Sequence, residues 1–322
     1  MSAATLALPA ARHRPLAGIG LVLVMGVWFV SLDTTAKYLG QVLPIILGLF
    51  ARYAMQAVIM GVWLTLRLVR GNGNLFRTAH PRFQLLRGTL LLATSALLFI
   101  GIRQMPVAEF TAVGMLSPVL VTVLATVFLR EHVSLLRLSL VAGGFAGALI
   151  VVRPGAGIFG WVALIPLVMA FVYAGFQLLT RRLSNLEHPL TTHFYTGLVG
   201  TVAVGALLLV LDPQASWVAL SNAPPSIWGL LLFVGLAGTV GHLCLILALG
   251  MAPMATLMPF TFLQLGFASI AGWLVFDHIP DDWAFVGIAV VGVCGATSVW
   301  LNFRESAAAQ RIAPSDSALT PD

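Results

Sequence analysis

Charged residues are scarce in this sequence. Asp, Glu, Lys and Arg together make up 9% of the 322 residues, whereas apolar residues make up 59% and the mean hydropathy is +0.99. A water-soluble domain needs a larger polar surface than this composition supplies. Soluble folds are therefore excluded, and the lipid bilayer is the expected solvent and partner of the chain.

Cysteine, lysine and catalytic motifs are equally sparse. Cys244 and Cys294 fall within apolar runs, which excludes a disulfide framework or a zinc knuckle. Lys37 is the only lysine and no GxxxxGK[ST] motif occurs, so the chain alone cannot drive transport with ATP. HExxH, GxSxG and metal-spaced clusters of His, Cys and carboxylate are also missing. We expect no enzyme activity, cofactor or metal, with a membrane-embedded transferase as a distant alternative.

The positive charges follow a topological pattern. The sequence pI is near 10.1, but the arginines form no stripe or aromatic-interleaved patch, so no nucleic-acid partner is expected. If the N-terminus is cytoplasmic, the outer turns contain only Arg103 and Arg153, with Lys37 at the outer end of the first span. The inside segments then contain Arg12, Arg14, Arg67, Arg70, Arg77, Arg82, Arg87, Arg130, Arg137, Arg181, Arg182, Arg304 and Arg311. The positive-inside rule therefore predicts that both termini are cytoplasmic.

Ten apolar stretches are each long enough to cross about 30 Å of hydrocarbon as a helix. They cover residues 16–38, 43–66, 83–103, 107–129, 135–152, 160–181, 189–211, 226–249, 254–276 and 283–303. Helices are expected because unpaired backbone amides cannot face lipid. The sequence thus predicts an all-α polytopic protein with ten transmembrane helices, in a plasma membrane such as a bacterial inner membrane. Residues 1–15 would be a cytoplasmic segment and 304–322 a disordered cytoplasmic tail.

An internal repeat relates the two halves of the chain. The segment at 105–133 is similar to the segment at 251–279, and in each an acid is followed by His, at 131–132 and at 277–278. The offset is 146 residues, and an offset of 145 aligns Pro44 with Pro189. These offsets indicate that the whole first half is duplicated.

The repeat predicts an inverted architecture. The first five-helix repeat would cover 16–152 and the second 160–303. Because five spans, an odd number, separate equivalent positions, the two halves would have opposite orientations in the membrane. Inverted repeats are typical of secondary transporters that alternate access around a site near the midplane.

Several short motifs occur in a characteristic order. They are "DTTAKYLG" at 33–40, "ARY" at 51–53, "LLRG" at 85–88, the run from "MPVAEF" to "FLREH", and "FDHIPDDW" after the ninth span. In this order the chain resembles the drug/metabolite transporter superfamily, and within it the EamA-type transporters of two five-helix repeats. The acid followed by Lys-Tyr-Leu-Gly and then Arg is similar to bacterial S-adenosylmethionine uptake carriers. The resemblance implies a carrier. Since the family also includes amino-acid exporters, riboflavin carriers and metallophore exporters, cargo and direction stay open.

Two ionisable residues lie within apolar spans. Asp33 is about 8 to 10 Å below the outer end of the first span, and Arg52 is about 13 Å below the outer start of the second. An Asp33–Arg52 pair is expected, with Lys37 one turn above Asp33 as a competing partner. Either the pair only fixes helix packing, or cargo or a proton breaks it during transport. The offset of 145 places Leu178 and Gly197 at the equivalent positions, so the charges are not duplicated, which favours a single site.

Five further side chains are candidates for the same pocket. Trp28 and Tyr173 suit a planar ring, and His242 could relay protons because imidazole titrates near neutral pH. Gln177 and Gln264 are amides within spans, which need a partner or a wet cavity. Ordinary packing is the alternative role for each of these residues.

These features together predict a gradient-driven or exchanging carrier for a small polar or zwitterionic metabolite. The cargo would be amino-acid-like or nucleoside- or vitamin-like, for example S-adenosylmethionine or riboflavin, and proton coupling is one option. An exporter of amino acids or of a metallophore is the alternative. Small-xxx-small patterns at 143–147 and 292–296 would support either internal packing or a homodimer.

Overall fold

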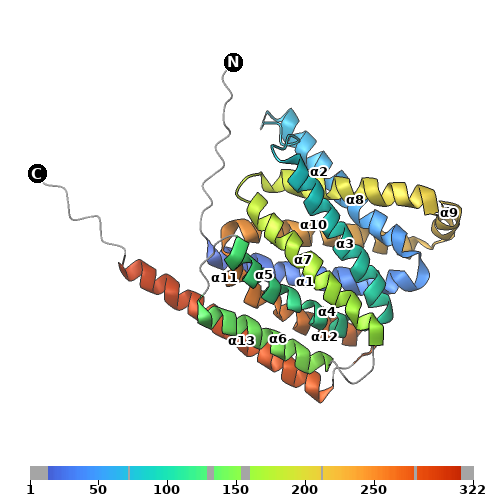
Figure 1. Cartoon of the computed structure of the whole chain (residues 1–322). Coiled ribbons are helices and arrows are strands. Elements are labelled where there is room, and N and C mark those ends of the chain that lie inside the picture. The colour runs from blue at the N-terminus through green and yellow to red at the C-terminus, as the bar shows by residue number, and fades with distance from the viewer. Residues whose placement is uncertain are drawn as a thin grey trace, which may run out of the picture.

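The computed structural model describes residues 14–71, 73–128, 134–153, 160–211, 213–278 and 281–312. Every regular element in these ranges is a helix (Figure 1). The elements are α1 (Pro15–Val42), α2 (Ile45–Val69), α3 (Pro81–Gln104), α4 (Val107–Gly114), α5 (Leu116–Phe128), α6 (Leu135–Val152), the 3₁₀ turn η1 (Gly160–Ala163), α7 (Leu164–Leu183), α8 (Pro189–Leu211), α9 (Pro213–Ser221), α10 (Pro225–Met251), α11 (Met254–Thr261), α12 (Leu263–Phe276) and α13 (Asp282–Ile312). The acid-His pair at 131–132 lies outside the described residues.

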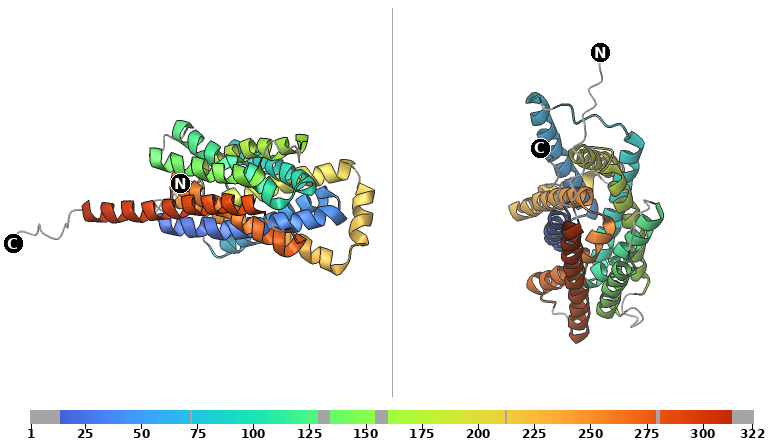
Figure 2. Two further views of the ribbon diagram at one scale, coloured as in Figure 1. Left: turned by 90° about the horizontal axis from the view of Figure 1, so that it is seen from below. Right: turned by 90° about the vertical axis from the view of Figure 1, so that its left-hand side faces the viewer.

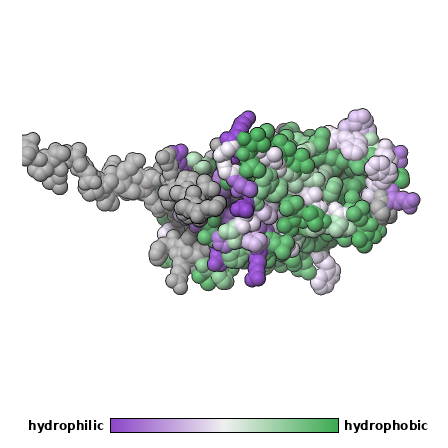
Figure 3. Space-filling view, turned by 90° about the horizontal axis from the view of Figure 1, so that it is seen from above, coloured by the Kyte–Doolittle hydropathy of each residue, from purple (hydrophilic) through white to green (hydrophobic). Residues whose placement is uncertain are grey.

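Membrane-length helices make up most of the bundle. In the described part of the chain, seven helical stretches are long and apolar enough to span a bilayer. They are Pro15–Val42, Ile45–Val69, Pro81–Gln104, Leu164–Leu183, Pro189–Leu211, Pro225–Met251 and Thr256–Phe276, and shorter apolar helices cover Phe110–Val121, Leu138–Gly147 and Phe285–Cys294. Figure 3 shows a broad apolar belt on one face, with hydrophilic residues towards both ends of the molecule. The chain is a multi-pass helical membrane protein, as the composition predicts.

Two predicted spans, the fourth and the ninth, are each broken into two helices. The breaks fall at Met115, between α4 and α5, and at Phe262, between α11 and α12. Pro118 lies three residues after the first break and Pro259 three residues before the second. Proline has no backbone N–H, so each removes one helical hydrogen bond near its break. Thr256–Phe276 is nevertheless one membrane-length stretch, as predicted for the ninth span, and each of the two spans is interrupted at one residue.

The last helix is longer than predicted. Helix α13 continues to Ile312, so residues 304–312 of the segment expected to be disordered are helical. Ala307, Ala308 and Ala309 fall in this stretch, and alanine has the highest intrinsic helix propensity. Figure 2 shows this end of α13 extending beyond the rest of the bundle. Residues 313–322 lie outside the described residues.

Helices that are distant in sequence are neighbours in the bundle. Helix α1 packs along α10, α3 along α7, α2 against α8, and α6 against α13, which lie side by side at one edge of the molecule (Figures 1 and 2). The repeat pairs α1 with α7, α2 with α8, α3 with α10 and α6 with α13. Under this pairing the α1–α10 contact is equivalent to the α3–α7 contact, and the α2–α8 and α6–α13 contacts are each equivalent to themselves. The interior is therefore built between the two halves of the chain.

Close packing between α2 and α8 depends on a glycine. A Cβ atom added to Gly200 would lie 2.3 Å from ring carbons of Tyr53, whereas one added to Gly266 would meet nothing within 4 Å. We expect Gly200→Ala to destabilise the fold by about 1–3 kcal/mol through overpacking. Gly266→Ala is the matched control and should be neutral or stabilising by about 0.5–1 kcal/mol. Thermal unfolding of the two variants in detergent checks this, and equal melting temperatures would contradict it.

Candidate functional site

A largely apolar cavity with several polar groups in its wall lies within the bundle, bounded by α1, α2, α3, α4, α5, α7, α10 and α12. Its internal volume is about 90 Å³ in this conformation, and it is partly open to the outside. Both halves of the chain contribute to its wall. Its polar lining residues are Asp33, Arg52, Thr94, Ser95, Thr111, Ser117, Tyr173, His242 and Gln264.

Five residues proposed from the sequence meet at this cavity. They are Asp33, Arg52, Tyr173, His242 and Gln264. The apolar part of the wall includes Phe29, Phe110 and Met169, so flat rings and flexible side chains stand beside the charges. The lining therefore offers contacts both to an apolar ring and to polar groups of a ligand.

Arg52 is held against α3 and α10. Its side chain is 3% exposed, Nη1 donates to Ser95 Oγ, and Nη2 is 3.4 Å from His242 Nε2. The Tyr53 ring centroid is 5.1 Å from the guanidinium, and the Tyr53 hydroxyl is 2.8 Å from the same Ser95 Oγ. Since Ser95 Oγ donates to the carbonyl of Leu91 at 2.7 Å, its lone pairs are left to accept from Arg52 and Tyr53. This network gives the guanidinium one defined orientation.

The same network assigns the tautomer of His242. Its Nδ1 is 3.0 Å from the carbonyl oxygen of Gly238, and a carbonyl only accepts, so Nδ1 carries the hydrogen. The Nε2 lone pair then faces Arg52 and accepts from it. A second proton on the imidazole would have to occupy Nε2, directly against a guanidinium. His242 is therefore arranged to orient Arg52, and a proton relay through it would first require Arg52 to move.

Asp33 lines the cavity without a direct partner. Its side chain is 6% exposed on α1, and among the described residues it makes no hydrogen bond or ion pair. The predicted Asp33–Arg52 pair is not formed, because Arg52 is turned towards Ser95 and His242. Arg52 still acts on Asp33 electrostatically. A buried carboxylate without a contact partner is costly, so this group is available for a cation on a ligand or for a proton.

Three other predicted site residues are not among the cavity's lining residues. Lys37 donates to the carbonyls of Ile102 at 2.8 Å and Met105 at 2.7 Å. Its positive charge there interacts favourably with the negative end of the α3 helix dipole. The Trp28 ring packs on Phe233, with centroids 6.2 Å apart. Gln177 is 2% exposed on α7 and its Oε1 has no partner among the described residues. Lys37 and Trp28 thus have contacts of their own away from the cavity, while Gln177 has an unsatisfied amide oxygen.

Comparison with known proteins decides the family. The sequence model of the EamA-like transporter family matches residues 16–153 and 160–300. The chain belongs to this family. The resemblance found in the motifs is therefore confirmed.

Individual relatives of this EamA-like protein are carriers of small metabolites. It is 29% identical to a riboflavin transporter of Brucella anthropi over 74% of this chain and 87% of that one. It is 26% identical to an S-adenosylmethionine uptake transporter of Rickettsia conorii over 86% of this chain and 90% of that one. A crystal structure with 15% identity superposes with a TM-score of 0.69, covering 88% of this chain and 98% of the other, which shows a shared fold.

Arg87 is a buried cation that lies within a helix and not in a loop. The pattern assigned it to the cytoplasmic loops, whereas its side chain is 0% exposed within α3. Its Nε donates to Thr180 Oγ1 at 2.7 Å, and Nη1 donates to the Thr192 carbonyl at 3.3 Å and to Thr196 Oγ1. The guanidinium also lies over the Phe176 ring at 4.6 Å. Its position four residues inside the predicted span 83–103 was the signal that could have identified it.

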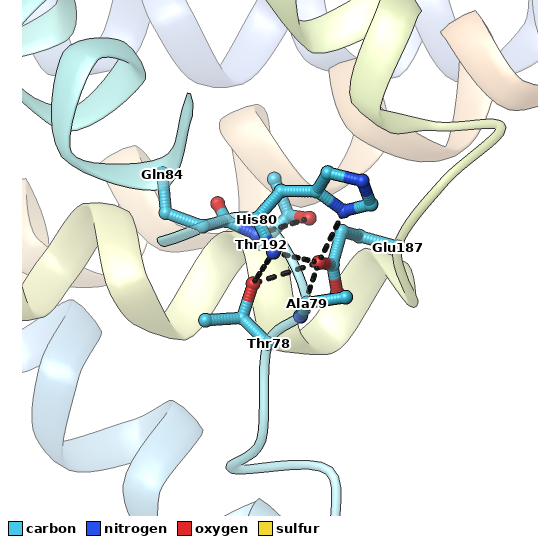
Figure 4. Close-up of polar contacts among 6 residues, drawn as sticks. All are labelled: Thr78, Ala79, His80, Gln84, Glu187 and Thr192. Atoms are coloured by element: carbon cyan, nitrogen blue, oxygen red, sulfur yellow. Dashed lines mark hydrogen bonds and ion pairs between the residues drawn. The ribbon is translucent and has the colours of Figure 1, made fainter. Parts of the chain in front are cut away.

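Glu187 anchors the start of α3 to the loop before α8 (Figure 4). Its Oε1 accepts from Thr78 Oγ1 at 2.7 Å and from the backbone N–H groups of Ala79 and His80 at 2.8 and 3.0 Å. His80 Nδ1 is also 3.0 Å from this oxygen. A carboxylate beside the first turn of a helix is favoured by the helix dipole. Spacing could not have indicated this contact, because residues more than 100 positions apart form it.

His188 caps the start of α8 next to Glu187. The backbone N–H of Leu190 donates to His188 Nδ1 at 3.2 Å, which requires the neutral imidazole. Partial burial, followed by the charge of Arg67, lowers the pKa of His188 below its usual value. The imidazole is therefore uncharged at neutral pH, and its hydrogen bond to the first turn of α8 is preserved.

Replacing Glu187 should weaken this end of the bundle. We expect Glu187→Gln to destabilise the fold by about 1–3 kcal/mol, because one buried oxygen loses its charge while several donors still face it. Asp282→Asn is the matched control, since Asp282 is an exposed acid in the first turn of α13. Thermal unfolding in detergent measures the difference. A Glu187→Gln variant as stable as Asp282→Asn would contradict the anchoring role.

Proposed function

We propose that this protein is a secondary active carrier that moves a small polar or zwitterionic metabolite across a bacterial inner membrane by alternating access. The observation that carries the proposal is the central cavity, where Asp33 has no hydrogen-bond or ion-pair partner within the described ranges and Arg52 is held in one orientation. Opposite charges at one cavity suit a solute that bears both an ammonium group and an acidic or carbonyl oxygen. Tyr173 and Phe29 in the same wall suit a planar ring.

The architecture of the proposal is two inverted five-helix repeats, 16–152 and 160–303, with both termini in the cytoplasm. The exchange of helix contacts between the halves supports this arrangement. Breaks at equivalent places, Met115 and Phe262, support it further, because discontinuous helices near the midplane are common in inverted-repeat carriers. The ten spans would be the seven membrane-length stretches together with α4 and α5 as one span, α6, and α13.

The proposed cargo class is a ring-bearing metabolite with polar or charged groups. Riboflavin and S-adenosylmethionine, after which two relatives are named, both belong to this class. S-adenosylmethionine has cationic groups that could meet Asp33 and a carboxylate that could meet Arg52. Riboflavin would use its ring carbonyls at Arg52 and its ring on the aromatic wall. The two compounds are therefore the probes that distinguish a charged cargo from a neutral one.

Counterflow in proteoliposomes tests the proposal. Vesicles containing the purified protein are preloaded with unlabelled riboflavin or S-adenosylmethionine, and entry of the labelled compound is followed. We expect transient accumulation of one of them, absent from protein-free vesicles. Cells expressing the protein are profiled in parallel by mass spectrometry, which gives the direction of transport and separates uptake from export. No redistribution of any metabolite would overturn the carrier proposal, and chemical conversion of the compound would support the transferase alternative.

The coupling ion is tested with the same vesicles. If Asp33 carries a proton in the cycle, an imposed pH gradient should accelerate accumulation. If the carrier works by exchange, the rate should depend on the compound inside the vesicle and not on the gradient.

A further inference from the structure

Arg87 is a fully buried cation without an acidic partner. In the described part of the chain its contacts are two threonine hydroxyls, one backbone carbonyl and the ring of Phe176. Its Nη2 has no acceptor among the residues that the structure describes. Enclosing a guanidinium without a counterion costs several kcal/mol, and a neutral side chain could pack in its place. A role in packing alone therefore does not account for the charge.

Arg87 and the central cavity share one face of α3. On α3, Arg87 lies on the same helix face as Leu91 and Ser95, which line the cavity, and Gln84 continues that face in the other direction. Eight residues separate Arg87 from Ser95, which is about 12 Å along the helix. The oxygen Gln84 Oε1 is buried without a partner among the described residues.

Helix α7 carries a matching face and packs against α3. Tyr173 lines the cavity, Gln177 follows four residues later, and Thr180 accepts the hydrogen bond from Arg87. The amide oxygen of Gln177 is buried without a partner in the described structure. Gln177 thus places an unsatisfied amide oxygen between the cavity and Arg87, and Gln84 places a second one beyond Arg87, towards the end of the bundle where the backbone of Arg14 bonds that of Met251.

We propose that Arg87 is a second cargo-binding station, which receives a carboxylate or carbonyl oxygen of the cargo after that oxygen leaves Arg52. This inference rests on the proposed carrier function and adds to it a second position for the cargo. In the present conformation Arg87 is enclosed by α3, α7 and α8. When the cytoplasmic side opens, Thr180 and Thr196 release part of the guanidinium, and the oxygen of the cargo replaces them.

Sided transport kinetics test the station. The half-saturation concentration is measured separately from the outer and the cytoplasmic face of oriented vesicles, with whichever of riboflavin and S-adenosylmethionine the unmodified protein moves. Arg87→Gln should raise the cytoplasmic value by about 10-fold or more, the effect of removing one charged donor, and change the outer value by less than about two-fold. Arg87→Lys, which keeps the charge, should show a smaller increase. A purely structural arginine would instead change both faces equally.

Cysteine labelling tests the same station independently of cargo. In a background with Cys244→Ala and Cys294→Ala, Arg87→Cys is compared with Leu86→Cys. Leu86 is the preceding residue and is 51% exposed on the outer surface of the bundle. An anionic methanethiosulfonate reagent added from the cytoplasmic side should modify Arg87→Cys and leave Leu86→Cys unmodified, because thiols facing lipid do not ionise. Equal kinetic effects at both faces, or an unreactive Arg87→Cys, would overturn the station. If neither compound is transported, the proposed cargo fails, while labelling still decides whether Arg87 lies on an open path.

Discussion

Asp33→Asn is expected to reduce transport by about 100-fold while leaving the folded protein intact. A hydrogen bond to a charged group contributes up to about 3 kcal/mol, and the loss of that energy corresponds to a rate reduction of about 100-fold. Asp33 makes no hydrogen bond or ion pair among the described residues, so its replacement removes no internal contact. Asparagine has nearly the same shape but cannot carry the negative charge or exchange a proton. The measurement is the initial rate of labelled cargo uptake at matched amounts of protein in the membrane.

The matched control for this variant is Asp281→Asn. Asp281 is an exposed acid that pairs with Arg153 outside the helices, so the substitution makes the same chemical change away from the cavity. An exposed ion pair contributes about 0–1 kcal/mol, and transport should therefore be nearly unchanged. Transport by Asp33→Asn within two-fold of this control would remove Asp33 from the transport cycle.

Arg52→Gln should also reduce transport by about 100-fold, for a different reason. Arg52 supplies the fixed positive charge of the cavity, and glutamine keeps a donor for Ser95 but loses the charge and the fork geometry. Arg52→Lys retains the charge without that geometry and should lose about 10-fold. Uptake rates of the three proteins, compared at equal membrane levels, give the order. Equal rates for the Lys and Gln variants would show that the charge of Arg52 is not used.

The double variant Asp33→Asn with Arg52→Gln separates two explanations. If the two charges only balance each other, removing both should restore transport relative to either single change. If each binds a different part of the cargo, the double variant should be as inactive as the single ones or more so. The structure favours the second outcome, because Asp33 and Arg52 form no direct ion pair and Arg52 is held by Ser95 and His242.

Much of the candidate site was accessible from the sequence, for a physical reason. An ionised or amide side chain in an apolar span is costly wherever the span lies in the bundle, so Asp33, Arg52, His242 and Gln264 were recognisable from their positions within apolar stretches. Tyr173 was proposed from the sequence only because its ring suits a planar ligand, and it does line the cavity. Trp28, Lys37 and Gln177 satisfied the same criteria but do not line the cavity. Hydropathy gives the depth of a residue in the bilayer and not the direction in which its helix turns it.

The amino-acid sequence by itself determined that this protein is a multi-pass helical membrane protein of the EamA-like family, with charges buried in its first two spans. These properties follow from composition and order along the chain, because hydrocarbon thickness and backbone hydrogen bonding leave few alternatives. Only the tertiary structure decided that Arg52 contacts Ser95 and His242, that Arg87 is buried, and that Glu187 anchors α3. Those contacts join segments that are distant in the sequence, most of them from opposite halves of the chain, so they depend on how the helices rotate and pack against one another.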